Sequence, residues 1–253
     1  MFGIAIVVDL AGAALMLVAA VASGERIPGA TTLVLAAIAG TFAVAGIVGL
    51  YQGLAVGRMG VVAPVTGLIA AILPVSVGFV RLGLPPTEVL VGIAAALMAV
   101  VLVSRTTDPA GRPSGLRYAL VGGVGLGMFN VAVAAFPEHS VAWPLVVIKL
   151  ASLVAIVAVV VVTRRPWRVP RRILPVVAAV AILDLAGNGF YLLATQAGRI
   201  DIAATLSSLY PVTTVVLAVL VLREHVSRSH LVGIVVAAIA IALIAGGSAG
   251  VTG

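Results

Sequence analysis

Long apolar stretches, separated by short gaps that hold most of the charged residues, dominate this sequence of 253 residues. A helix needs about 20 mostly apolar residues to cross the hydrocarbon core of a bilayer. By this measure the chain contains nine candidate spans, at 2–22, 33–54, 61–82, 87–104, 117–136, 141–162, 173–196, 201–222 and 229–247. The gaps are too short for a soluble domain, so nearly all of the function must reside in the membrane-embedded part.

Composition agrees with a membrane environment and excludes several kinds of chemistry. Hydrophobic residues make up 62% of the chain and charged residues 9%, whereas a soluble chain carries about half and about a quarter. Apolar runs such as 151–162 lack the alternation of a barrel strand, so we expect an all-α, polytopic membrane helical bundle. The absence of cysteine excludes disulfides, thiolate zinc sites and iron–sulfur clusters. No phosphate-binding loop is present, and we expect no cofactor and no metal.

The basic residues indicate membrane topology rather than nucleic-acid binding. The chain has a formal net charge of +7, but its basic residues lie mostly in the gaps, not in one patch with aromatic side chains. With nine spans, eleven arginines fall on the side of the N-terminus and three on the other. This bias predicts a cytoplasmic N-terminus in the cell membrane. Because no basic residue precedes the first span and Asp9 interrupts it, we expect a retained helix and not a cleaved signal peptide.

The chain resembles itself at a fixed displacement. A shift of 140 residues places 2–22 on 142–162 and Tyr51 on Tyr191. One residue is then inserted in the second copy, so the shift becomes 141. With this shift, Leu-Val-Gly-Ile at 90–93 falls on an identical segment at 231–234. Such self-similarity predicts a duplication.

The duplication divides the chain into two repeats. Residues 1–104 hold four spans and 105–253 hold five, because the span at 117–136 has no partner in the first half. Equivalent spans lie five apart in the chain, and consecutive spans alternate in direction. Because five is an odd number, the two copies must cross the membrane in opposite directions. Inverted repeats of this kind are typical of secondary transporters. We expect a parent architecture of five plus five helices, with the leading helix absent or encoded upstream of Met1.

Short motifs in the second repeat carry a family resemblance. They are Tyr191, Ala194, Gly198–Arg199, Ala203–Ala204, Ser207–Ser208–Leu209–Tyr210–Pro211, Leu222–Arg223–Glu224 and Leu231–Val232–Gly233. The first repeat shows a fainter version of the same order. This pattern resembles the EamA-like domains of the drug/metabolite transporter superfamily. The resemblance implies a ten-helix, two-repeat transporter of small organic solutes that exchanges them or couples them to an ion. Leu84 stands where the second repeat has Glu224, which departs from the family pattern.

Two charged residues lie deep inside spans at equivalent positions of the two repeats. Asp9 and Lys149 are separated by the repeat displacement and carry opposite charges. Ionisable side chains in a bilayer are costly and usually face a cavity or a partner. Lys149 could anchor an anionic group of a solute, with Asp9 as its counter-ion or as a protonatable coupling site. The alternative is a permanent ion pair that only joins the two repeats.

A third charge, Asp184, begins a polar stripe on one helix face. Asn188 and Tyr191 follow it at i+4 and i+7, positions that share a face of a helix. The stripe could line a solute pathway with a carboxylate, an amide and a phenol. The alternative is that Asp184 pairs with Lys149 while the other two side chains hold helices together.

The remaining pathway candidates are weaker. Tyr51, the partner of Tyr191, and its neighbour Gln52 lie near the end of a span, where an interfacial role is the alternative. Asn130 is a lone amide in the unpaired span, and helix packing is the alternative for it.

We therefore expect a secondary-active permease or exporter of a small organic solute that works by alternating access, with a coupling ion or counter-substrate and the lipid bilayer as partners. A translocator of a lipid-linked head group and a non-transporting scaffold subunit remain alternatives. We do not expect an enzyme, because no carboxylate or histidine cluster has catalytic spacing. The sequence does not indicate an oligomeric state, a substrate or a direction of transport.

Overall fold

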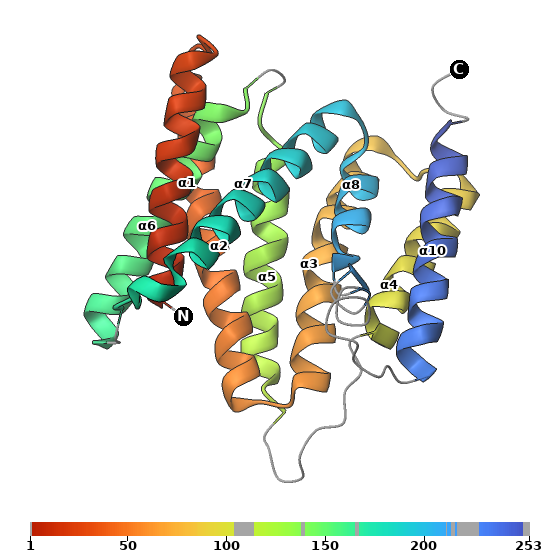
Figure 1. Ribbon diagram of the computed structural model, residues 1–253. Helices are drawn as coiled ribbons and strands as arrows, with labels where there is room; N and C mark the ends of the chain where they lie inside the picture. The colour runs from red at the N-terminus through yellow and green to blue at the C-terminus, as the bar shows by residue number, and fades with distance from the viewer. Residues whose placement is uncertain are drawn as a thin grey trace. The chain divides into compact units, whose positions relative to one another are not determined.

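The computed structural model describes residues 2–103, 114–137, 140–164, 167–210, 212–213, 216 and 228–249, and every regular element within them is helical. The helices are α1 (Phe2–Ala22), α2 (Ala30–Val56), α3 (Met59–Leu82), α4 (Thr87–Val103), α5 (Leu116–Val133), α6 (Ala142–Thr163), the 3-10 helix η1 (Arg171–Ile173), α7 (Leu174–Ala197), α8 (Ile200–Ser207) and α10 (Arg228–Ala249). Figure 1 labels the α-helices. The prediction of an all-α fold is confirmed.

Seven of the described helices are long and apolar enough to cross a membrane: α1, α2, α3, α5, α6, α7 together with η1, and α10. The span predicted at 87–104 corresponds to α4, whose 17 residues rise about 25 Å at 1.5 Å per residue. The first predicted span matches α1 residue for residue, and most other described ends differ from the prediction by three residues or fewer. The chain is therefore a multi-pass helical membrane protein.

The span predicted at 201–222 is not one continuous helix, because α8 ends at Ser207 and a turn follows at 208–209. Serine and threonine hydroxyls compete for main-chain carbonyls here: Thr205 Oγ1 donates to Asp201 O at 2.7 Å, and Ser208 Oγ donates to Thr205 O at 2.7 Å. The sequence also places Pro211, which has no N–H to offer Ser207 O, four residues further on. Pro211 and most of the segment to residue 227 lie outside the described residues.

The chain forms two compact units, each built from both halves of the sequence. Unit 1 comprises Met1–Val44 and Phe129–Ala197, and unit 2 comprises Ala45–Met128 and Gly198–Gly253. Each unit therefore contains residues of both predicted repeats.

In unit 1, α1 and α6 lie side by side and antiparallel (Figure 1). Glu25, just beyond the end of α1, accepts hydrogen bonds from the main chain at the start of α6. At the other end of the pair, Gly3 packs so closely on the main chain of Trp167 that a Cβ has no room there. The end of each helix thus meets the start of the other, as expected for inverted copies.

In unit 2, α4 and α10 pack through two contacts that mirror each other. A Cβ at Gly92 would lie 2.7 Å from Ile244 Cγ1, and a Cβ at Gly233 would lie 2.5 Å from Val103 Cγ2. Gly92 and Gly233 are repeat equivalents, and so are Val103 and Ile244, each pair being separated by 141 residues. Exchanging the two copies therefore turns one contact into the other, which places α4 and α10 about a local two-fold axis.

Candidate functional site

Three of the predicted pathway residues meet in unit 1. The ammonium group of Lys149 on α6 lies 3.3 Å from Asp9 Oδ1 on α1. The same group forms an ion pair with Asp184 Oδ2 on α7. One cation from the middle of the chain is thus held by carboxylates from two other helices, and we call these three residues the charge cluster.

Glycines give the charge cluster its space. Gly12 lies one turn beyond the aspartate of α1, and a Cβ there would be 3.3 Å from both Cδ and Cε of Lys149. The aliphatic part of the lysine therefore runs along the bare surface of α1. On the other side of α6, Gly40 of α2 packs against the main chain, where a Cβ would lie 2.5 Å from Ile148 O.

The members of the charge cluster differ in burial. The side chains of Lys149 and Asp9 are 7% and 9% exposed, whereas that of Asp184 is 37% exposed. Ser152 Oγ, one turn along α6 from the lysine, donates to Asp9 Oδ2 at 2.8 Å. Both carboxylate oxygens of Asp9 are therefore occupied. Asp184 Oδ1 has no hydrogen-bond partner among the residues that the structure describes.

The formal charges of the three groups in the charge cluster do not sum to zero. With all three groups ionised, two carboxylates face one ammonium, which leaves one net negative charge inside an apolar bundle. A buried charge is expensive in a bilayer. Asp184, which is half-buried, is the most exposed member of the charge cluster.

The Asp9–Lys149 contact lies on a local two-fold axis of unit 1. These residues are repeat equivalents, and a pair of equivalents in direct contact must lie beside the axis that exchanges them. The neighbouring contacts agree: Ser152 bonds to Asp9, and Gly12, the equivalent of Ser152, packs on Lys149. Asp184 breaks the symmetry, because its equivalent is the buried Val44.

The polar stripe on α7 is only partly open. Asn188 Nδ2 donates to the main-chain oxygen of Asp184 at 2.9 Å, so this amide remains on its own helix. Tyr191 is buried, and its hydroxyl donates to the main-chain oxygen of Asn130 at 3.3 Å. Tyr191 therefore joins α7 to the end of α5, and Asn130 contributes its carbonyl rather than its side chain. Asp184 and Asn188 are the half-buried part of the stripe.

The two remaining candidates belong to unit 2. Tyr51 and Gln52 lie in the last turns of α2, and Tyr51 is half exposed. The charge cluster belongs to unit 1. An exposed tyrosine near a helix end fits the interfacial alternative.

Glu25 was missed as a structural residue because it lies in a short gap. Its carboxylate accepts from the N–H groups of Val141, Ala142 and Trp143 at 3.1, 2.9 and 3.3 Å. Trp143 Nε1 in turn donates to Glu25 O at 2.9 Å. A carboxylate at these unpaired N–H groups caps the helix and complements its dipole. It fixes the start of α6, the helix that carries Lys149.

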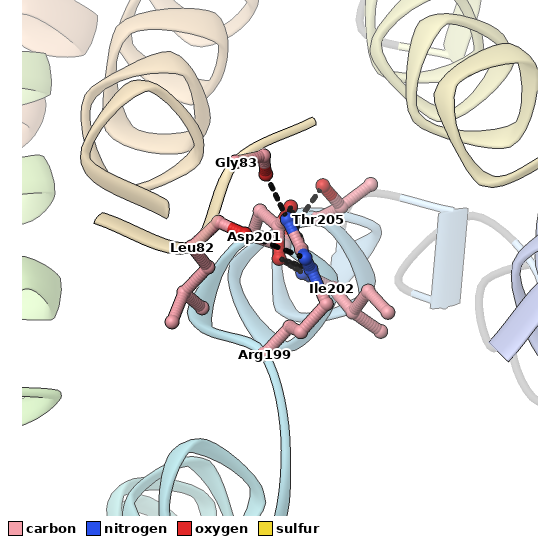
Figure 2. A network of polar contacts seen from close by, with 6 residues as sticks. All are labelled: Leu82, Gly83, Arg199, Asp201, Ile202 and Thr205. Carbon is pink, nitrogen blue, oxygen red and sulfur yellow. Dashed lines mark hydrogen bonds and ion pairs between the residues drawn. The ribbon is translucent and has the colours of Figure 1, made fainter. Parts of the chain in front are cut away.

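A second buried ion pair, shown in Figure 2, was also missed. Asp201 in the first turn of α8 is fully buried and accepts from Arg199 Nη2 at 2.9 Å and from Arg199 Nε at 3.1 Å. The same guanidinium donates to the carbonyls of Leu82 and Gly83 at the end of α3. Gly78 allows this approach, since a Cβ there would lie 2.8 Å from Asp201 Cβ.

This pair binds two helix ends together in unit 2. The guanidinium of Arg199 satisfies carbonyls at the C-terminus of α3, and the carboxylate of Asp201 lies at the N-terminus of α8, so both charges complement helix dipoles. The signal in the sequence is Arg-Ile-Asp at a span boundary, where an arginine also fits a topology signal. In the first repeat, Arg58 is the equivalent of Arg199, but Gly60 stands at the position of Asp201, so the carboxylate is missing.

Comparisons with known proteins agree with this architecture. A crystal structure of another protein, one of 17 matching chains, superposes with a TM-score of 0.75 at 20% sequence identity, over 98% of this chain and 87% of that chain. At this identity the likeness concerns the fold alone. No curated protein matches the chain. The sequence profile of the EamA-like transporter family matches residues 113–246, more than half of the chain. The chain belongs to the EamA-like transporter family.

Proposed function

We propose that this protein is a secondary-active transporter that moves a small organic solute by alternating access, with the charge cluster as its solute-binding centre. The family indicates a membrane transporter of small solutes. The observation that carries the finer proposal is an unbalanced charge cluster with one accessible carboxylate, held between helices of both repeats. Intramembrane charges of this kind generally mark a substrate or ion pathway.

A purely structural role accounts for the charge cluster less well. Buried ion pairs add little net stability, because desolvation offsets much of the attraction. A structural lock would also be expected to balance its charges and to be shielded throughout. Here the surplus carboxylate, Asp184, is the most exposed member.

The energy source follows from the sequence and the fold. The chain has no phosphate-binding loop, so transport is expected to run on an ion gradient or on exchange with a counter-solute. We place the protein in the cell membrane, where such gradients exist. Inverted copies supply two related conformations for alternating access, and the mirrored contacts of α1 with α6 and of α4 with α10 support such copies.

Reconstitution tests the proposal. The purified protein is inserted into liposomes loaded with a panel of small organic solutes, and counterflow of the labelled solutes is measured. We expect saturable counterflow of at least one solute, lost in Lys149→Ala and Asp184→Asn. Glu88→Gln is the matched control, since it makes the same carboxylate-to-amide change at an exposed position of α4 that has no described ion pair. Full counterflow in both cluster variants would remove the charge cluster from the mechanism, and no counterflow of any solute would contradict transport itself.

A further inference from the structure

We infer that the transported solute presents a positively charged, hydrogen-bond-donating group of the ammonium class to Asp184. The inference rests on the proposed function and adds the chemical class of the solute.

Charge is the first argument. The charge cluster holds two carboxylates and one ammonium, so it lacks one positive charge. In the low dielectric of the bundle, an uncompensated negative charge is strongly unfavourable unless a cation neutralises it. A solute ammonium group supplies the missing charge, whereas a carboxylate would double the surplus.

Hydrogen-bonding capacity is the second argument. Both oxygens of Asp9 are engaged, and Asp184 Oδ2 is paired with Lys149. Asp184 Oδ1 has no donor within the described part of the chain. One turn further along α7, the amide nitrogen of Asn188 donates to a main-chain carbonyl, and its amide oxygen has no donor among the described residues. Two acceptor oxygens on the half-buried part of one helix face suit a donor-rich group such as an ammonium.

Access is the third argument, and it disfavours an anionic solute. The side chain of Lys149 is only 7% exposed, and two carboxylates already bind its ammonium group. An anion would have to displace a paired carboxylate from a buried cation. The side chain of Asp184 is 37% exposed, so a cation reaches the charge cluster without breaking an existing contact.

The test uses three matched probes with the purified full chain: n-butylammonium, n-butanol and butyrate, which share an alkyl group and differ in charge. The midpoint of thermal unfolding is measured against probe concentration. We expect n-butylammonium alone to raise the midpoint. Because hydrogen bonds to charged groups contribute about 1.5–3 kcal/mol, its affinity should fall roughly tenfold or more in Asp184→Asn. Asp184→Glu should restore the preference for the cation, and Glu88→Gln should behave as the parent.

The inference is overturned if n-butanol or butyrate stabilises the protein as much as n-butylammonium does. It is also overturned if Asp184→Asn leaves the affinity for n-butylammonium unchanged, or if no probe changes the midpoint of unfolding. The counterflow assay separates these failures from failure of the proposed function: counterflow of neutral or anionic solutes alone would leave transport standing and remove the ammonium class.

Discussion

Lys149 is the single lysine of the chain, and its environment uses both its aliphatic stem and its charge. Its stem needs the surface left bare by Gly12, and its charge holds Asp9 and Asp184 on two other helices. Removing one partner of a buried ion pair leaves an uncompensated charge, which costs far more than the pair contributes.

The first prediction at this scale concerns Lys149→Met, which keeps an unbranched side chain, shorter by one heavy atom, and removes its charge. We expect it to lower the free energy of unfolding by about 3–5 kcal/mol, because two buried or half-buried carboxylates lose their counter-ion. Adding Asp9→Asn and Asp184→Asn should recover most of that stability without recovering transport. Thermal unfolding and counterflow of the single and triple variants check this. A triple variant as unstable as Lys149→Met would show that the loss came from packing and not from charge.

The second prediction concerns Gly12→Val. The larger side chain must displace the lysine stem, since even a Cβ lies 3.3 Å from it. We expect counterflow to fall sharply. Gly29→Val, at a position with no heavy atom within 4 Å of a built Cβ, should leave counterflow unchanged. Equal activity in the two variants would mean that the lysine can move aside without consequence.

At the scale of elements, the ends of helices are held by charges from distant parts of the sequence. Glu25 caps α6 from the gap after α1, and Arg199 binds the end of α3 while pairing with Asp201 at the start of α8. Glu25 and Arg199 both lie in gaps between the predicted spans.

The repeat offers a matched pair of variants for the link between α3 and α8. Arg199→Ala leaves the fully buried Asp201 without its partner, so we expect a loss of about 3–5 kcal/mol in the free energy of unfolding. Arg58→Ala changes the equivalent, exposed residue, which has no described ion pair, and should cost no more than about 0.5 kcal/mol. Unfolding of both variants in the same detergent checks the difference. Similar losses would mean that the ion pair does not stabilise unit 2.

At the scale of the molecule, the mirrored contacts indicate which helix contacts persist through the transport cycle and which can change. In alternating access by inverted repeats, the two copies exchange conformations. A contact between two repeat equivalents, such as Asp9 with Lys149, is the same contact after the exchange. The two contacts between α4 and α10 are converted into each other by the exchange, so both are still present afterwards. Both are expected in both states, whereas the pairing of Asp184 has no counterpart and is free to change.

This argument predicts that α4 and α10 can be joined without loss of activity. Gly92→Cys together with Ile244→Cys places two thiols where Ile244 now packs on the bare Gly92, within reach of a disulfide, in a chain that has no cysteine. Counterflow should be the same before and after oxidation. Inhibition on oxidation, reversed by a reductant, would show that these helices separate during the cycle.

The sequence predicted the helical membrane fold and the meeting of Asp9 with Lys149 because each rests on a regular signal: apolar runs of spanning length and a fixed repeat displacement. It left open whether Asp184 pairs with Lys149, since residues on different helices share no periodicity. It missed Ser152 and Asp201 for a related reason. A serine inside an apolar run and an acid at a helix boundary look ordinary until a partner from another helix lies beside them.

The central claim, that the charge cluster is reached in turn from the two sides of the membrane, is tested most directly by Asn188→Cys. Position 188 lies one turn from Asp184 and leaves the charge cluster intact. A membrane-impermeant thiol reagent is applied to one face of oriented vesicles and then to the other, with Gly29→Cys as a loop control that reacts from one face. We predict that the thiol at position 188 is modified from both faces and is protected by a bound solute. Reaction from one face only, or from neither, would contradict alternating access at this site.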